Sequence, residues 1–328
     1  MCRILVPLDG SEMAEEILPD ACDLAGGDGE LLLTHIAHTP ISPRGVNGFQ
    51  ARNAKSAGER YLLSKAKSLR ERGFKVSVHV EMGTDVSAAI DQVAAESGAD
   101  LIACATHGRG PGGRLVHGGV IWRAIAQSRI PVLIRHFPER PRRNASVDGK
   151  KRLVLVPLDG SPFAEKAIPV AEWLARRLNA GICLVRVVEP LPSTVAISYA
   201  VPQPGYEKEV EDAHKYLDQL ANRLHQDAPA LEVESAAYFG TTHESLEKCV
   251  EDKGITHIVM STHGRTALSR VLLGSVADSL VHELSLPVIL IPALAPGRLE
   301  EHGSNLSRIG APFGGSATRE KTPAAARL

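Results

Sequence analysis

Apolar runs alternate with amphipathic segments along the chain, and each segment has the length of a strand or a helix. In the first half, strand-like runs occupy residues 3–9, 30–37, 74–81, 99–106 and 131–137. Segments with helical periodicity lie between them, at about residues 12–25, 50–72, 85–97 and 118–128. Apolar strands in alternation with helices are typical of a parallel sheet with helices on both faces. The pattern therefore predicts a small doubly wound α/β domain with five strands.

The whole pattern occurs twice, because two motifs recur in the same order. "LVPLDGS" occupies residues 5–11 and 155–161, and "THGR" occupies residues 106–109 and 262–265. The strands expected in the second half occupy residues 152–159, 181–189, 231–239, 256–262 and 287–293. We therefore expect two copies of one domain, at residues 1–138 and 151–294. A polar linker at residues 139–150 should join them, and residues 295–328 should form a disordered tail.

The first helix of each copy carries its own start and break signals. Ser11 and Ser161 stand where an N-cap is expected, and Pro162 fits the first helical position, which needs no backbone N–H. Pro19 and Pro169 fall inside the two helices and should kink or break them.

Composition narrows the class of protein. The 328 residues carry a net charge of −1, which gives no reason to expect nucleic acid or an anionic membrane as a partner. No apolar run approaches the ~20 residues of a membrane helix, and the start "MCRILVPLDG" lacks the cleavage region of a signal peptide. Five scattered cysteines without a CxxC pair predict neither a zinc site nor a disulfide framework, so a reduced cytoplasm fits best. Cys104 and Cys183 lie in apolar runs and are expected to be buried.

The candidate chemistry follows strands one and four, whose carboxyl ends meet where the strand order of a doubly wound sheet reverses. In copy two, Gly264 and Gly274 bracket a loop, and glycine lets backbone N–H groups approach a ligand. Gly274 and Ser275 open a helix, whose N-terminus attracts anions, and Arg265 adds a cationic donor. Asp159 ends strand one, where an acceptor could reach a base or a ribose. Judged by spacing alone, these residues also fit an ordinary turn and cap, so both interpretations stay open.

Catalysis has little support in these loops. His107 and His263 have no carboxylate or second histidine at ligand spacing, and we expect structural roles for them. Asp9 and Asp159 are single carboxylates, which argues against a paired acid–base site or a two-metal centre. We therefore expect no catalytic residue, no metal held by protein ligands and no enzyme activity.

With "LVPLDGS", "VMSTHGRTALSRVLLGSV" and a closing "PVILI", the chain resembles a tandem universal stress protein, over nearly all of residues 1–294. The resemblance implies a doubly wound five-stranded fold with strand order 3-2-1-4-5 in each copy. The nucleotide-binding branch of that family has a phosphate loop of the form Gly, two residues, Gly, nine residues, Gly, then Ser or Thr. Carried onto copy two, this implies an ATP site formed by Pro157, Asp159, Val187, Ser261, His263, Gly264, Arg265, Gly274, Ser275 and Val276. Ser261 departs from the pattern, because it stands where the first glycine belongs.

Copy one departs further, so the resemblance implies a weaker second site there. Its matching residues are Pro7, Asp9, Ile36, Gly108, Arg109, Gly118 and Gly119. Ala105 replaces the first glycine, and Gly119 lacks the hydroxyl of Ser275. A lost hydrogen bond to a charged group costs roughly 1.5–3 kcal/mol. We therefore expect copy two to bind nucleotide first, and copy one to bind it weakly or to be a structural remnant.

The resemblance also implies partners and rival functions. ATP, accompanied by Mg²⁺, would regulate contacts with an unidentified protein, and the alternatives are a non-nucleotide interaction module of the same fold and a slow ATPase. Single-copy members dimerise through their last strands, so residues 131–136 and 287–292 are expected to pair within this chain as a pseudo-dimer. Two such chains could in addition form a homodimer.

Overall fold

The computed structural model describes residues 2–38, 48–107, 122–125, 128–137, 152–190, 206–262 and 274–292. The expected linker and tail lie outside this part of the chain, as does most of the helix expected at residues 118–128. Residues 122–125 of that segment are helical.

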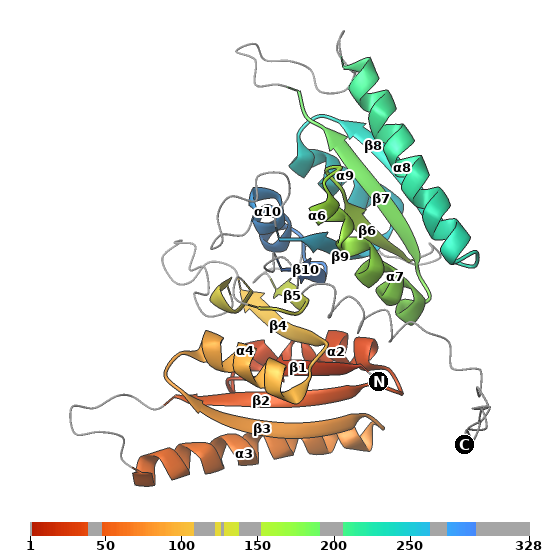
Figure 1. Ribbon diagram of the computed structural model, residues 1–328. Coiled ribbons are helices and arrows are strands. Elements are labelled where there is room, and N and C mark those ends of the chain that lie inside the picture. Colours follow the sequence, from red (N-terminus) through yellow and green to blue (C-terminus); the bar gives the residue numbers. More distant parts are fainter. Residues whose placement is uncertain are drawn as a thin grey trace, which may run out of the picture.

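The first half of the chain has the expected alternation of strands and helices (Figure 1). Its strands are β1 (Arg3–Pro7), β2 (Glu30–His38), β3 (Lys75–Gly83), β4 (Leu101–His107) and β5 (Val132–Phe137). Its helices are α1 (Glu12–Glu15), α2 (Leu18–Ala25), α3 (Gly48–Glu71) and α4 (Val86–Ser97).

The second half repeats this order. Its strands are β6 (Leu153–Pro157), β7 (Gly181–Val188), β8 (Val233–Phe239), β9 (Ile255–Ser261) and β10 (Val288–Ile291). Its helices are α6 (Pro162–Glu165), α7 (Ala167–Leu178), α8 (Glu207–Asp227), α9 (Thr242–Lys253) and α10 (Ser275–Glu283).

The ten strands of the described part of the chain belong to one sheet, in the order β3-β2-β1-β4-β5-β10-β9-β6-β7-β8. Each half has the order 3-2-1-4-5 with parallel pairs, so the expected doubly wound fold is confirmed. The halves join where β5 and β10 pair antiparallel, with Leu133 opposite Ile289. Figure 1 shows these two strands between the red-orange half and the green-blue half. The chain thus forms the expected pseudo-dimer, and one edge strand of each half is covered.

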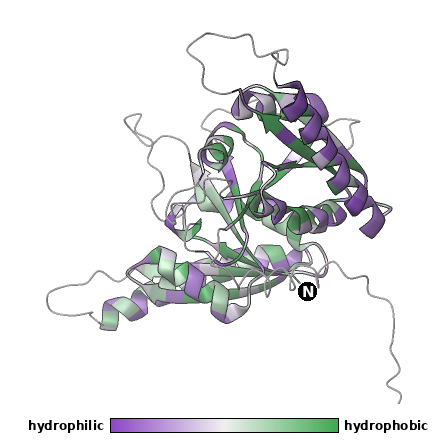
Figure 2. Ribbon diagram, turned by 45° about the horizontal axis from the view of Figure 1, so that its top comes forward, coloured by the Kyte–Doolittle hydropathy of each residue, from purple (hydrophilic) through white to green (hydrophobic). Residues whose placement is uncertain are grey.

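Two hydrophobic layers cover the two faces of the sheet. One layer contains side chains from α2, α3, α7 and α8, and the other contains side chains from α4, α9 and α10. Strand alternation carries both layers across the junction, because Leu133 and Ile289 lie in the first layer and Ile134 and Val288 lie in the second. Figure 2 shows the strands as mainly hydrophobic and the outward surface of α8 as hydrophilic.

The first helix of each half is broken, as the two prolines predict. Ser11 and Ser161 cap the short helices α1 and α6 through their side-chain oxygens. Pro19 lies in the first turn of α2 and Pro169 in the first turn of α7, where a missing N–H does no harm. The short helices α1 and α6 therefore stand alone, directly after the first strand of each half.

Arg177, near the end of α7, joins the two halves on one face of the sheet. Its Nε donates to the carbonyl oxygen of Leu24 at 2.7 Å, and its Nη2 donates to the carbonyl oxygen of Ala25. Nη2 also forms an ion pair with Asp28 at 2.6 Å. The two carbonyls belong to the last turn of α2, where no partner exists within the helix. The arginine therefore donates to a helix end in the other half of the molecule, where the carbonyl oxygen of Ala25 also accepts a hydrogen bond from the N–H of Gly29 at 2.9 Å.

No helix in the described part of the chain is both long enough and apolar enough to span a lipid bilayer. All five cysteines are buried with free thiols, as expected for Cys104 and Cys183.

Candidate functional site

The candidate site lies where the first and fourth strands of each half separate. The last residues that pair β1 with β4 are Leu5 and Ile102, and the last that pair β6 with β9 are Leu155 and Ile258. Beyond these residues the first and fourth strands of each half no longer pair with each other. Doubly wound sheets bind ligands in this crevice.

In the second half, the N-terminus of α10 lies beside the end of β9. Gly274 is the N-cap residue, and its N–H donates to the carbonyl oxygen of Thr262 at 2.8 Å. The first turn closes when the N–H of Asp278 donates to the carbonyl oxygen of Gly274 at 2.9 Å. The N–H groups of Ser275 and Val276 therefore have no partner within the helix, and such groups bind anions.

The backbone of Gly274 is extended, with φ −60° and ψ 147°. Any residue adopts this conformation, so the glycine is not needed for backbone geometry. A side chain placed here changes the chemistry at the helix end without strain in the backbone.

The other residues predicted for copy two gather at the same end of the sheet. Pro157 ends β6, and Asp159 follows it, with its Oδ1 accepting a hydrogen bond from the N–H of Ser161 at 2.9 Å. Val187 lies near the end of β7, and Val187 and Val276 both pack on the hydrophobic layer that contains α9 and α10.

Ser261, which departs from the glycine of the phosphate-loop pattern, is the last residue of β9. It pairs with Ile291 of β10 and is only 7% exposed. The strand therefore accommodates the serine without a break in its pairing.

Several predicted residues lie outside the described part of the chain. These are His263, Gly264, Arg265, Gly108, Arg109, Gly118 and Gly119, together with the side chain of Ser275. Their roles stay predictions.

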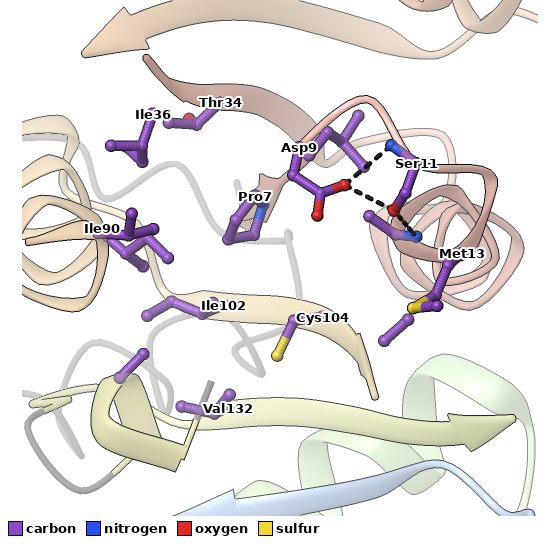
Figure 3. Close-up of a pocket in the computed structure, with 15 residues that line it drawn as sticks. Pro7, Asp9, Ser11, Met13, Thr34, Ile36, Ile90, Ile102, Cys104 and Val132 are labelled. Atoms are coloured by element: carbon purple, nitrogen blue, oxygen red, sulfur yellow. Dashed lines mark hydrogen bonds between the residues drawn. The ribbon is translucent and has the colours of Figure 1, made fainter. Parts of the chain in front are cut away.

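A cavity of about 350 Å³ lies at the carboxyl end of β1 in the first half (Figure 3). Three residues predicted for the weaker site, Pro7, Asp9 and Ile36, line it. The Oδ1 atom of Asp9 accepts hydrogen bonds from the N–H of Ser11 at 2.9 Å and from its Oγ at 2.6 Å. Figure 3 shows these two residues on one side of the cavity, and Ile36 and Ile90 on the opposite side. The carboxyl end of β1 in copy one therefore borders a formed, mainly apolar cavity.

Sequence reasoning did not assign most of the other lining residues to a site, and Thr34 and Cys104 are two of them. Thr34 lies two residues before Ile36 on β2, so strand alternation places both on one face. That alternation could have added Thr34 to the residues predicted from the sequence. Cys104 was predicted to be buried, and it is, but its side chain also lines the cavity.

A tyrosine–glutamate pair holds the short first helix in each half, and sequence reasoning did not find it. The hydroxyl of Tyr61 on α3 donates to Glu15 at 2.9 Å, and the hydroxyl of Tyr216 on α8 donates to Glu165 at 3.0 Å. Burial, and then the neighbouring carboxylate, raise the pKa of both phenols. Each long helix is thereby tied to the short helix that follows the first strand.

The sequence profile of the universal stress protein family matches residues 1–136 and residues 151–292. The chain belongs to the universal stress protein family. The two matched segments are called domain 1 and domain 2 below, and they account for both halves of the sheet.

Curated relatives carry the same family name. A universal stress protein of Methanocaldococcus jannaschii is 26% identical over 150 residues, which is 42% of this chain and 93% of the relative. A universal stress protein of Mycobacterium tuberculosis is 30% identical over 151 residues, again 42% of this chain, and the match spans about half of that relative (47%).

Solved structures share the tandem fold. A universal stress protein from Archaeoglobus fulgidus superposes with a TM-score of 0.62 and 18% identity, covering 88% of this chain and 98% of that one. One from Pseudomonas aeruginosa superposes with a TM-score of 0.58 and 16% identity, covering 93% of this chain and 97% of that one. At these sequence identities the superposition shows a shared fold and nothing further.

Proposed function

We propose that this universal stress protein binds ATP in domain 2, with the phosphates at the N-terminus of α10. The observation that carries the proposal is the hydrogen bond from the N–H of Gly274 to the carbonyl oxygen of Thr262. It holds the start of α10 against the end of β9, so the helix N-terminus lies at the crevice where doubly wound sheets bind nucleotides.

The remaining residues suit the other end of the nucleotide. Asp159 follows β6 on the far side of the same crevice, where its carboxylate can accept a hydrogen bond from the ribose or base. Val187 offers an apolar wall for the base. Among the described residues no group of three or more His, Cys, Asp or Glu side chains could hold a metal ion, so Mg²⁺ would enter with the phosphates.

The function that follows is regulatory. Bound ATP would change the contacts of the protein with a partner protein in the cytoplasm, and the chain would not act as an enzyme. Hydrolysis of ATP needs groups that position a water molecule and the phosphates. The segment "PLDGS" after β6 supplies one carboxylate, that of Asp159, and "GSV" at 274–276 offers no lysine of the kind that NTPases place after the phosphate loop. Two such chains could associate further as a homodimer.

Nucleotide analysis and titration test the proposal together. The purified protein is denatured and any released adenine nucleotide is identified by mass spectrometry. ATP is then titrated by calorimetry into the wild type, Gly274→Asp and Ser275→Ala. Aspartate is a good N-cap residue, so the helix is kept while a negative charge faces the phosphates. We expect Gly274→Asp to weaken ATP at least about tenfold, equivalent to about 1.4 kcal/mol.

The matched control is Gly118→Asp, at the corresponding position of domain 1. It should leave the affinity for ATP unchanged. Equal affinity in the wild type and in both domain 2 variants would show that the phosphates do not bind at α10. An absence of any ATP binding would favour the non-nucleotide interaction module, which the serine at position 261 also fits.

A further inference from the structure

Two buried cysteines of domain 2 form a pair on one face of the sheet. Cys183 lies on β7 and Cys249 on α9, and both are 0% exposed within the hydrophobic layer that contains α9 and α10. The Cys183 thiol donates a hydrogen bond to the sulfur of Cys249. Close approach of the two sulfurs is the first condition for a disulfide.

An ion pair between α9 and β8 shows how the helix lies over these strands. Lys253, one turn after Cys249, places its Nζ atom 2.8 Å from Oε2 of Glu234. Glu234 is the residue of β8 that pairs with Cys183 of β7. The end of α9 therefore lies across both strands, with Cys249 over β7 and Lys253 over β8.

The surroundings favour a thiolate at Cys249. The pKa of Cys249 is lowered, chiefly by the hydrogen bond from Cys183 and further by the Tyr238 hydroxyl and the Lys253 ammonium, although burial opposes them. The pKa of Cys183 is raised, first by this hydrogen bond and then by burial. Burial also raises the pKa of the other three cysteines. Cys249 is therefore the cysteine of this chain that is best suited to act as a nucleophile.

Tyr238 connects the pair with the surface of the molecule. It lies on the edge strand β8, and its hydroxyl donates a hydrogen bond to the sulfur of Cys249. Because the tyrosine is only half-buried, a single side chain separates this sulfur from solvent at that point.

Domain 1 shows that the fold does not need the two thiols. By strand pairing, Leu32 of domain 1 occupies the position of Cys183. Val93 occupies the position of Cys249, because each lies five residues before the glycine that ends its helix. Both side chains of domain 1 are apolar and buried in the same hydrophobic layer, so packing at these positions is possible without sulfur.

We propose that Cys183 and Cys249 form a reversible disulfide when the protein meets hydrogen peroxide, and that this bond joins β7 to α9. Disulfides of this transient kind are compatible with a reducing compartment. The proposal does not depend on the ATP site proposed above.

The reaction proceeds in two steps. As a thiolate, Cys249 attacks one peroxide oxygen, the O–O bond breaks, and the leaving hydroxide takes up the proton that the thiol released. Cys249 is then a sulfenic acid. The sulfur of Cys183 attacks the sulfur of Cys249, the S–O bond breaks, and the second hydroxide takes the proton of the Cys183 thiol. Two thiols and one peroxide thus give one disulfide and two water molecules, and a dithiol reductant reverses the change.

Thiol counting and peptide mapping test the proposal on the purified full chain. The folded protein is treated with a molar excess of hydrogen peroxide, which catalase then removes, and its thiols are counted after denaturation with a chromogenic thiol reagent. We expect the five free thiols to fall by two, and a tryptic peptide pair to be linked through Cys183 and Cys249 in the non-reduced mass spectrum. Dithiothreitol should restore all five. The midpoint of urea unfolding should be higher in the oxidised protein, because the bridge constrains the unfolded chain.

Four variants assign the reaction. Cys249→Val, which copies domain 1, should keep its remaining thiols free. The matched control is Cys104→Ala, which removes a buried cysteine of the same hydrophobic layer in domain 1 and should still form the bridge. Tyr238→Phe should slow formation of the bridge about three- to tenfold, the effect of one lost hydrogen bond. Tyr216→Phe, which removes the hydroxyl bonded to Glu165, should leave the rate unchanged.

Two results would overturn the proposal. One is a folded protein that keeps all five thiols under a peroxide treatment that consumes thiols of the urea-unfolded chain. The other is oxidation without the bridge, seen as a sulfinic acid at Cys249 with no linked peptide, or as a loss of two thiols that persists in Cys249→Val. Failure of the ATP proposal has a different signature, because it is measured by calorimetry on the reduced protein.

Discussion

At the scale of single residues, the two domains differ most clearly in the wall of the crevice. Thr34 and Cys104 in domain 1 correspond to Val185 and Met260 in domain 2 by the pairing of their strands. Domain 1 thus carries an unsatisfied hydroxyl and a smaller side chain in its wall. Both differences act on what the crevice can hold, while the strand order is the same in the two halves of the sheet.

Thr34→Val should stabilise the unliganded protein. The change removes a buried hydroxyl that has no partner and adds a methyl group of the same shape, so the free energy of unfolding should rise by about 1 kcal/mol. Urea unfolding measures the change. The matched control is Thr106→Val, because the buried Thr106 hydroxyl lies 3.4 Å from Nδ1 of His136. The control should destabilise, and a loss of stability in both variants would mean that the Thr34 hydroxyl is satisfied.

At the scale of elements, the joint between the domains has two parts. The β5–β10 pair makes one sheet of two domains, and the contact of α7 with α2 adds a helix cap between them. Arg177 places its cation at the C-terminus of α2, where the helix dipole favours positive charge. Asp28, largely exposed, completes the arrangement, and its pKa is lowered chiefly by the hydrogen bond from Arg177.

Arg177→Met should weaken the joint, because it keeps the aliphatic stem and removes the donors to the end of α2. We expect the free energy of unfolding to fall by about 1–3 kcal/mol, since charged donors to buried carbonyls are lost. Arg176→Met is the control on the same helix. Arg176 forms an exposed i,i+4 pair with Glu172, which contributes less than about 0.5 kcal/mol. Equal effects of the two substitutions in a denaturant titration would exclude a special role for Arg177.

At the scale of the whole molecule, the groove between the domains collects charged groups around a histidine. His257 on β9 lines a groove of about 580 Å³ together with Arg135 of domain 1 and Arg152. Burial, and then the two arginines, lower the pKa of His257 to about 4. The histidine is therefore neutral in the folded protein at neutral pH.

This shift predicts loss of stability in mild acid. The unfolded chain binds a proton at His257 near the ordinary pKa of about 6.5, and the folded chain does so only near pH 4. The contribution of the neutral His257 to the free energy of unfolding is therefore fully present above about pH 6.5 and is lost as the pH falls toward about 4. Relative to His257→Gln, the wild type should lose about 1–3 kcal/mol over that range, allowing for partial exposure. Urea unfolding at several pH values measures the free energy of unfolding of both proteins. If that free energy fell equally with pH in both, the lowered pKa of His257 would be contradicted.

Sequence patterns predicted most of this architecture, for identifiable physical reasons. Apolar runs mark strands that are buried on both faces, and the repeated motifs placed the two crevices. The β5–β10 joint was predicted from the resemblance to the family. The Arg177 contacts could not be predicted, because they join residues 153 and 152 positions apart whose approach depends on how the two halves meet. The unsatisfied state of Thr34 was equally hidden, because it depends on every neighbour that could have offered a partner.

The most direct test of the ATP proposal is the methyl spectrum of the methionine-labelled protein during titration with ATP. Met260 lies on β9, close to the proposed site at α10, and Met13 lies in domain 1. We predict a saturable shift of the Met260 resonance in the wild type that is weakened at least about tenfold in Gly274→Asp. A Met260 resonance that ATP leaves unmoved, or one that moves equally in both proteins, would contradict nucleotide binding at the N-terminus of α10.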